Sequence, residues 1–108
     1  MGMVVRRFDV YLVELDPAVG SEIRKTRPCV IISPNEMNCL KTVLIAPMTT
    51  KGFDAPSRVK LQFQEKSGLV LLDQLRSVDK SRLAKKLGAV DIKTQKLISS
   101  TLVDMFEL

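Results

Sequence analysis

This 108-residue sequence contains no histidine, which limits the side chains that could carry out catalysis. Histidine is the usual general base of hydrolases, since its pKa lies near neutrality. The sequence also has no cysteine–histidine cluster of the kind that binds zinc. Any catalysis must therefore use Arg, Lys, Asp, Glu, Ser, Thr, Tyr or Cys. We expect it to need neither a metal nor a cofactor.

The two cysteines indicate a reducing environment. Cys29 opens the apolar run 29–32, where a small buried thiol is expected, and Cys39 lies in a polar connection. Two cysteines at this separation, with no recognisable signal peptide, fit the cytoplasm better than a disulfide framework. No apolar stretch approaches the ~20 residues of a transmembrane helix, so no membrane contact is expected.

The charge balance favours an anionic partner. Lysine and arginine outnumber the acids 17 to 12, which gives a formal charge of +5 and a pI near 9.5. Nucleic acid is the commonest partner of such a chain, although many small domains are mildly basic without binding one. The length and the apolar fraction of 45% predict one globular domain over residues 1–108.

The first three quarters of the chain carry strand signals. Residues 8–15 alternate between apolar and polar side chains and end at Asp16-Pro17, and residues 58–63 alternate in the same way. Residues 30–32, 42–46 and 69–72 are short apolar runs between turn signals. Residues 33–35 could open a brief helical turn. This pattern predicts a small barrel or sandwich.

The tail changes to a helical period. Asp91 is a plausible N-cap, and residues 92–106 read as an amphipathic helix packed on the barrel. Its expected core-facing stripe consists of Ile98, Leu102, Met105 and Phe106, widened by Leu97 and Val103.

Four segments, in order, carry a resemblance to a known family. They are the strand and loop of residues 7–22, with Asp16-Pro-Ala-Val-Gly-Ser-Glu22; Arg27-Pro28 with the apolar strand after it; Pro47-Met-Thr-Thr50; and Asp73-Gln-Leu-Arg-Ser-Val-Asp79. Together they resemble the MazF/PemK toxins over essentially the whole chain. The sequence departs from the family pattern at Phe8, where glycine is usual, and at residues 23–26, where many members are rich in glutamine and glycine.

The resemblance implies a β-rich α+β fold, an SH3-like small barrel of about five to seven strands with a C-terminal helix, as in CcdB and PemK. It implies a homodimeric toxin of a toxin–antitoxin system and a sequence-specific endoribonuclease for single-stranded RNA, with messenger RNA the expected substrate. The ribose 2′-OH would attack the adjacent phosphate, leaving a 2′,3′-cyclic phosphate and a 5′-OH. The cognate antitoxin would block the site with an acidic C-terminal segment.

Carried over to this sequence, the catalytic residues would be Arg27, Thr49 and Glu22. Arg27 can present a rigid fork of donors to the phosphate oxygens, whose charge grows in the transition state. Thr49 can donate a hydrogen bond to the same phosphate, and Glu22 is the candidate general base. Each has a structural alternative: a surface arginine before a buried strand, a strand-terminating threonine, and a carboxylate that pairs with a nearby arginine.

A second group of residues is expected to bind RNA without taking part in the chemistry. Phe53 is the aromatic residue best placed to stack on a base, and the other aromatics are expected in the core. Asp73, Gln74 and Arg76 could equally form a polar network that holds strand ends together. The basic run Lys80, Arg82, Lys85 and Lys86 reads as an ordinary solvated face. The full expected RNA-binding set is Arg24, Lys25, Thr50, Lys51, Phe53, Arg58, Asp73, Gln74 and Arg76.

Two other functions fit the same elements. One is a CcdB-like poison that inhibits DNA gyrase without cutting RNA, and the other is a non-catalytic SH3-like module that binds nucleic acid. The Arg27-Pro28 and Pro47-Met48-Thr49 elements favour the nuclease.

Overall fold

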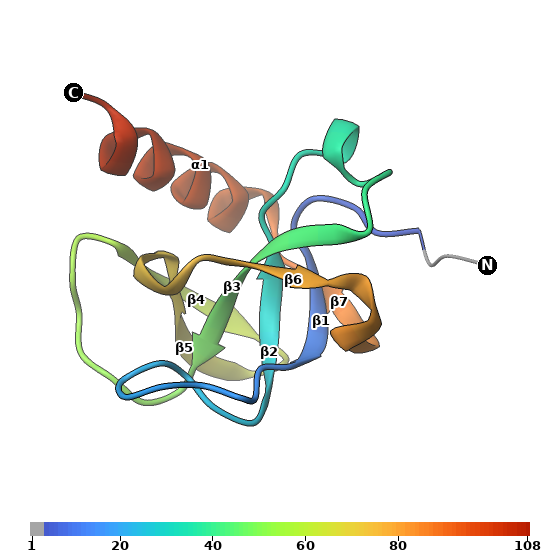
Figure 1. The fold of residues 1–108 in the computed structure, drawn as a ribbon. Helices are drawn as coiled ribbons and strands as arrows, with labels where there is room; N and C mark the ends of the chain where they lie inside the picture. Colours follow the sequence, from blue (N-terminus) through green and yellow to red (C-terminus); the bar gives the residue numbers. More distant parts are fainter. Residues whose placement is uncertain (1–3) are drawn as a thin grey trace.

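The computed structural model describes residues 4–108, so residues 1–3 of the predicted domain lie outside it. Within that range, one curled antiparallel sheet of seven strands is followed by a single long helix (Figure 1). None of the helices in this range is long and apolar enough to cross a membrane. The strands are β1 (Asp9–Glu14), β2 (Thr26–Ile31), β3 (Thr42–Thr49), β4 (Arg58–Phe63), β5 (Lys66–Leu71), β6 (Arg76–Asp79) and β7 (Leu83–Ala89). Helix α1 spans Ile92–Phe106, and the short 3-10 turns are η1 (Asn35–Met37), η2 (Leu72–Gln74) and η3 (Lys80–Arg82).

The long strand β3 organises the sheet because it changes partners along its length. The hydrogen-bonded order is β4-β5-β3-β2-β1-β7, and β6 also pairs with β3. Residues 42–45 of β3 face β6, residues 45–47 face β2, and Met48 and Thr49 face β5. This exchange curls the sheet into a half-barrel, which confirms the predicted small β-barrel with a C-terminal helix.

Two apolar clusters, one on each face of β2, hold the sheet together. Val30 belongs to the cluster that includes Ile98 of α1, whereas its neighbours Cys29 and Ile31 belong to the cluster with Tyr11 and Ile45. Successive side chains of a strand point to opposite faces, so a strand that is covered on both faces must be apolar throughout. The continuous apolar run at residues 29–32 is explained in this way.

Two strands are absent from the sequence interpretation, and both lie in or beside the basic run. Lys80 and Arg82 begin and end η3, and residues 84–86 form the exposed middle of edge strand β7. The Arg82 Nη1 donates to the Glu14 carbonyl at 3.2 Å and to the Asp16 carbonyl at 2.7 Å. Describing the whole run as a solvated face was therefore wrong, because Arg82 terminates β1.

A second member of the run also makes a specific contact. The ammonium group of Lys86 lies 3.5 Å from the carboxylate of Asp9, which is only 5% exposed. A buried carboxylate needs such a partner. Lys85 is also exposed, but it takes part in none of the ion pairs found within residues 4–108.

Helix α1 has the predicted bounds and N-cap, and the Asp91 carboxylate accepts a hydrogen bond from the Thr94 N–H at 2.8 Å. The predicted core-facing stripe is correct at Ile98 and at half-buried Leu102, which packs against the same cluster, and wrong at Leu97 and beyond Leu102. Phe106 is 70% exposed and Val103 is 60% exposed. Figure 1 shows why, because the C-terminal end of α1 extends beyond the edge of the sheet.

Two non-glycine residues adopt the left-handed conformation at the points where the sequence departs from the family pattern. Phe8 has φ 72° and Lys25 has φ 68°. Glycine adopts this region freely, whereas an L-residue does so at a cost. Phe8 offsets part of that cost by packing against the cluster that contains Val10 and Ile98.

Candidate active site

The pairing of β2 with β3 brings the two main predicted catalytic residues together. Cys29 of β2 pairs with Pro47 of β3. Two residues farther along the same antiparallel register, Arg27 lies opposite Thr49. Both residues line one cavity of about 360 Å³. Its other walls include Pro28, Met48 and residues of β4, β5 and β7. A basic guanidinium and a hydroxyl thus share a single hollow on the surface.

Arg27 is exposed and held from one side. Its Nε donates to the Arg24 carbonyl at 3.2 Å, which fixes the plane of the guanidinium. Among residues 4–108 no group accepts a hydrogen bond from its two terminal nitrogens, so these remain available to an anion. Two parallel N–H donors match the spacing of two phosphate oxygens.

Thr49 is half-buried at the end of β3, and its hydroxyl oxygen accepts from the Lys51 N–H at 3.1 Å. This contact orients the side chain and leaves the hydroxyl hydrogen free to donate. The backbone of Thr49 is equally constrained, because a Cβ at Gly68 of β5 would lie 2.7 Å from the Thr49 carbonyl oxygen.

Gly68 is a site feature that the sequence interpretation missed, because Lys66-Ser67-Gly68 read as a turn. In the structure these three residues open β5. A glycine inside a strand often marks a close approach of two backbones, and that signal was available in the sequence.

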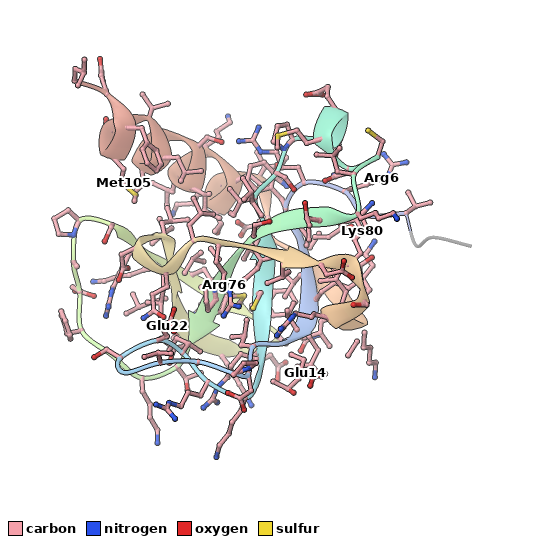
Figure 2. The ribbon with its side chains drawn as sticks, viewed as in Figure 1. Arg6, Glu14, Glu22, Arg76, Lys80 and Met105 are labelled. Atoms are coloured by element: carbon pink, nitrogen blue, oxygen red, sulfur yellow. The ribbon has the colours of Figure 1, made fainter. Side chains whose placement is uncertain are left out.

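Glu22 lies on the loop between β1 and β2 and faces two adjoining hollows rather than the Arg27 cavity. One, of about 640 Å³, also includes Thr49, and the other, of about 190 Å³, includes Arg76 and Gln74. Figure 2 shows Glu22 on this loop below Arg76. The Glu22 carboxylate accepts from the Val19 N–H at 2.6 Å, a contact within its own loop. Glu22 as general base stays a prediction.

Gln74 and Arg76 hold the loop and the strand beside the site. The Gln74 amide oxygen accepts from the Ile23 N–H at 2.8 Å, and Arg76 Nη1 donates to the Leu15 carbonyl at 3.3 Å.

Burial raises the pKa of the neighbouring Cys29 thiol to about 12, against a smaller opposing effect of the Arg76 charge. Cys29 is therefore a neutral core residue and not a nucleophile.

Arg58, Asp73 and Phe53 form a connected group at the side of the larger hollow. The Arg58 guanidinium is bidentate to Asp73, with Nε–Oδ1 and Nη2–Oδ2 distances of 3.2 Å, and its Nη1 donates to the Phe53 carbonyl at 3.2 Å. The same guanidinium lies 4.5 Å from the centre of the Phe53 ring. Burial alone would raise the pKa of Asp73, but hydrogen bonds and the charge of Arg58 outweigh it and lower that pKa.

Of the other predicted RNA-binding residues, two line these hollows and two do not. Thr50 and Lys51 line the Arg27 cavity, and Lys51 also reaches the larger hollow. Arg24 and Lys25 are exposed on the β1–β2 loop. Within residues 4–108 no three cysteine, aspartate or glutamate side chains gather closely enough to hold a metal ion.

Comparisons with known proteins agree with this architecture. A curated relative, the endoribonuclease MazF of Staphylococcus saprophyticus, is 35% identical over 106 aligned residues, which cover 92% of this chain and 88% of the relative. The crystal structure of MazF from Deinococcus radiodurans superposes with a TM-score of 0.84 at 24% identity, over 98% of this chain and 99% of that one. A mycobacterial endoribonuclease in complex with its cognate antitoxin superposes with a TM-score of 0.81 at 24% identity, over 96% of each chain.

A sequence profile matches nearly the whole chain, from residue 6 to residue 106. It describes the PemK-like, MazF-like toxins of type II toxin–antitoxin systems. The resemblance drawn from the motifs is confirmed, and the chain belongs to this toxin family.

Proposed function

We propose that this chain is a toxin endoribonuclease that cuts single-stranded RNA at short sequence motifs, without a metal, by attack of a ribose 2′-OH on the adjacent phosphate. The observation that carries the proposal is the shared cavity of Arg27 and Thr49. Its support is family membership and the endoribonuclease activity named for the Staphylococcus relative.

The reaction needs three services: removal of the 2′-OH proton, stabilisation of the phosphorane and protonation of the leaving 5′-oxygen. Arg27 donates from its two terminal nitrogens to the non-bridging oxygens, and the Thr49 hydroxyl donates to the same phosphate. Arginine keeps its proton at neutral pH, so Arg27 acts through charge and hydrogen bonds.

We assign the general base to Glu22. The β1–β2 loop must then shift so that its carboxylate releases the Val19 N–H and approaches the 2′-OH. The products are a 2′,3′-cyclic phosphate and a 5′-OH end.

The partners follow from the same proposal. The toxin works as a cytoplasmic homodimer and cuts messenger RNA. A cognate antitoxin inhibits it by laying an acidic C-terminal segment across the basic surface near Arg24, Lys25 and Lys51, all exposed. The solved toxin–antitoxin complex of the mycobacterial neighbour supports this partner. A gyrase poison is disfavoured, since the curated relative is an endoribonuclease.

The deciding experiment compares Arg27→Ala, Arg27→Lys and Lys85→Ala. Loss of one transition-state donor typically lowers the rate by ~10²–10³-fold. We expect this loss in Arg27→Ala with a smaller effect on RNA affinity, and little recovery in Arg27→Lys, because an ammonium lacks the fork. Lys85, exposed on β7, is the matched control and should leave the rate unchanged.

Thermal melting of the three variants guards against a folding artefact. Arg27→Ala should melt like the wild type, because the side chain is exposed. Cleavage by Arg27→Ala at nearly the wild-type rate would contradict its catalytic role.

A further inference from the structure

The short turn η2 holds both loops that border the larger hollow. Gln74 accepts from the Ile23 N–H on the β1–β2 loop, and Asp73 binds Arg58 at the end of the β3–β4 loop. Ser57 adds a hydrogen bond from its hydroxyl to Asp73 at 3.3 Å. Figure 1 shows both loops at the same end of the sheet as the end of β3. The walls of the hollow beside Thr49 are therefore fixed from one point.

The position of the Phe53 side chain is not explained by packing in the core. Its side chain is 71% exposed in a polar loop, although a large apolar ring in water gains nothing by being ordered there. The loop is nevertheless held in place, because Arg58 Nη1 donates a hydrogen bond to the Phe53 carbonyl. The Arg58 guanidinium also lies over the ring. The rest of the ring remains available to a flat ligand.

Arg58 and Asp73 are not arranged as RNA ligands themselves. All three Arg58 nitrogens are engaged, and its side chain is only 13% exposed. Both Asp73 oxygens accept from Arg58, and a carboxylate beside an RNA strand would repel phosphate. Their mutual pairing instead fixes the plane of the guanidinium under the ring.

We propose that Phe53 is a preformed stacking platform for one nucleobase next to the scissile phosphate, and that Asp73 and Arg58 are positioning residues that hold it. The inference rests on the proposed RNA substrate and deepens it. An ordered aromatic ring can stack on any base, and each such contact raises the affinity for RNA by roughly five- to a hundredfold. The shape of the hollow beside it, which includes Thr49 and Gly52, then selects among bases.

The test is a double-mutant cycle on binding, so it does not depend on cleavage. Each probe is a short RNA with a 2′-deoxy residue at the mapped cleavage site and 2-aminopurine at one flanking position. If the wild-type protein does not cleave RNA, the probe is oligo(U) that contains one 2-aminopurine. In the wild type we expect quenching of 2-aminopurine at one position. Phe53→Ala should abolish this quenching and weaken binding about tenfold.

Asp73→Asn should reproduce part of both effects, and Arg58→Lys should do the same through loss of the fork. The decisive result is the double variant, because Asp73→Asn should change the affinity of Phe53→Ala by less than about twofold. Asp54→Asn is the matched control. It breaks the exposed Lys60–Asp54 ion pair of 3.0 Å in the same loop without touching the ring.

Multiplicative losses in the double variant would show that Asp73 contacts RNA directly and would overturn the positioning role. Wild-type protein that binds RNA without quenching at any position would overturn the platform. Melting temperatures identify unfolding, and if Asp73→Asn unfolds, Arg58→Lys completes the same cycle. Failure of the proposed function has a separate signature, which is quenching by a wild-type protein that leaves unmodified RNA intact.

Discussion

Replacing Gly68 by alanine should damage both stability and cleavage through a single contact. The new Cβ would lie 2.7 Å from the Thr49 carbonyl oxygen, which is about 0.7 Å inside the 3.4 Å at which ordinary van der Waals contact begins. The obstacle is backbone rather than a flexible side chain, so β5 or the end of β3 must move. Overpacking of this kind costs about 1–3 kcal/mol.

The displacement matters for rate because it falls on the residue that carries the phosphate-binding hydroxyl. A misplacement of about 1 Å can cost on the order of 10²-fold in rate, so we expect a loss of roughly tenfold or more. The melting temperature should fall by about 5 °C or more. Gly68 does not occupy the left-handed region, so the collision, not backbone strain, is the cause.

The assay is single-turnover cleavage of a fluorogenic RNA at saturating protein, at a temperature where every variant is folded. Lys85→Ala is the control, because it changes an exposed side chain of β7 that does not line the cavity. A Gly68→Ala variant with the wild-type rate and melting temperature would refute the reasoning. Lower stability with an unchanged rate would show that the placement of Thr49 is not critical.

Five further predictions can be checked with purified protein. Cleavage should persist in excess EDTA and leave a cyclic phosphate; activity that returns only with Mg²⁺ or Mn²⁺ would contradict this. Sedimentation should give a particle of about twice 12.1 kDa, and an acidic antitoxin peptide should compete with RNA. Asp91→Ala should lower the melting temperature by roughly 5 °C at pH 7. Because hydrogen bonds from Thr94 lower the pKa of Asp91, this difference should be complete above pH ~4 and vanish as the pH falls through that lowered pKa. Native protein at pH 8 should incorporate one iodoacetamide, at exposed Cys39, while Cys29 stays unmodified until unfolding.

The sequence predicted the elements whose burial is visible in a repeating pattern. Strand β4 alternates between buried and exposed residues, and residues 29–31 of β2 are apolar and buried on both faces. The sequence pattern also located β1, although this strand is buried along nearly its whole length and does not alternate. Edge strand β7 was missed because its middle residues 84–86 are all exposed, so its sequence shows no alternation between apolar and polar side chains. The apolar spacing of α1 predicts a helix but not how far the sheet extends beneath it. Val103 and Phe106 were therefore wrongly predicted to lie in the core.

The candidate site was predictable as a set of residues but not as a geometry. Motif order brought attention to Arg27 and Thr49, yet their common cavity depends on the β2–β3 register, which no local pattern specifies. The pairing of Arg58 with Asp73 joins residues 15 apart and needs β4, β5 and η2 in place. Local spacing cannot report such a contact, so Arg58 read as a free phosphate-binding cation.

Phe8 and Lys25 adopt a left-handed backbone conformation to which glycine is better suited. A left-handed L-residue costs about 1–2 kcal/mol, so the rest of the fold carries that burden at two points. At Lys25, whose side chain is exposed, replacement by glycine should make the protein more stable. At Phe8 the same replacement would remove an aromatic ring that packs against the core, and this loss offsets the gain in backbone conformation. A glycine substitution therefore offers added stability at Lys25 rather than at Phe8.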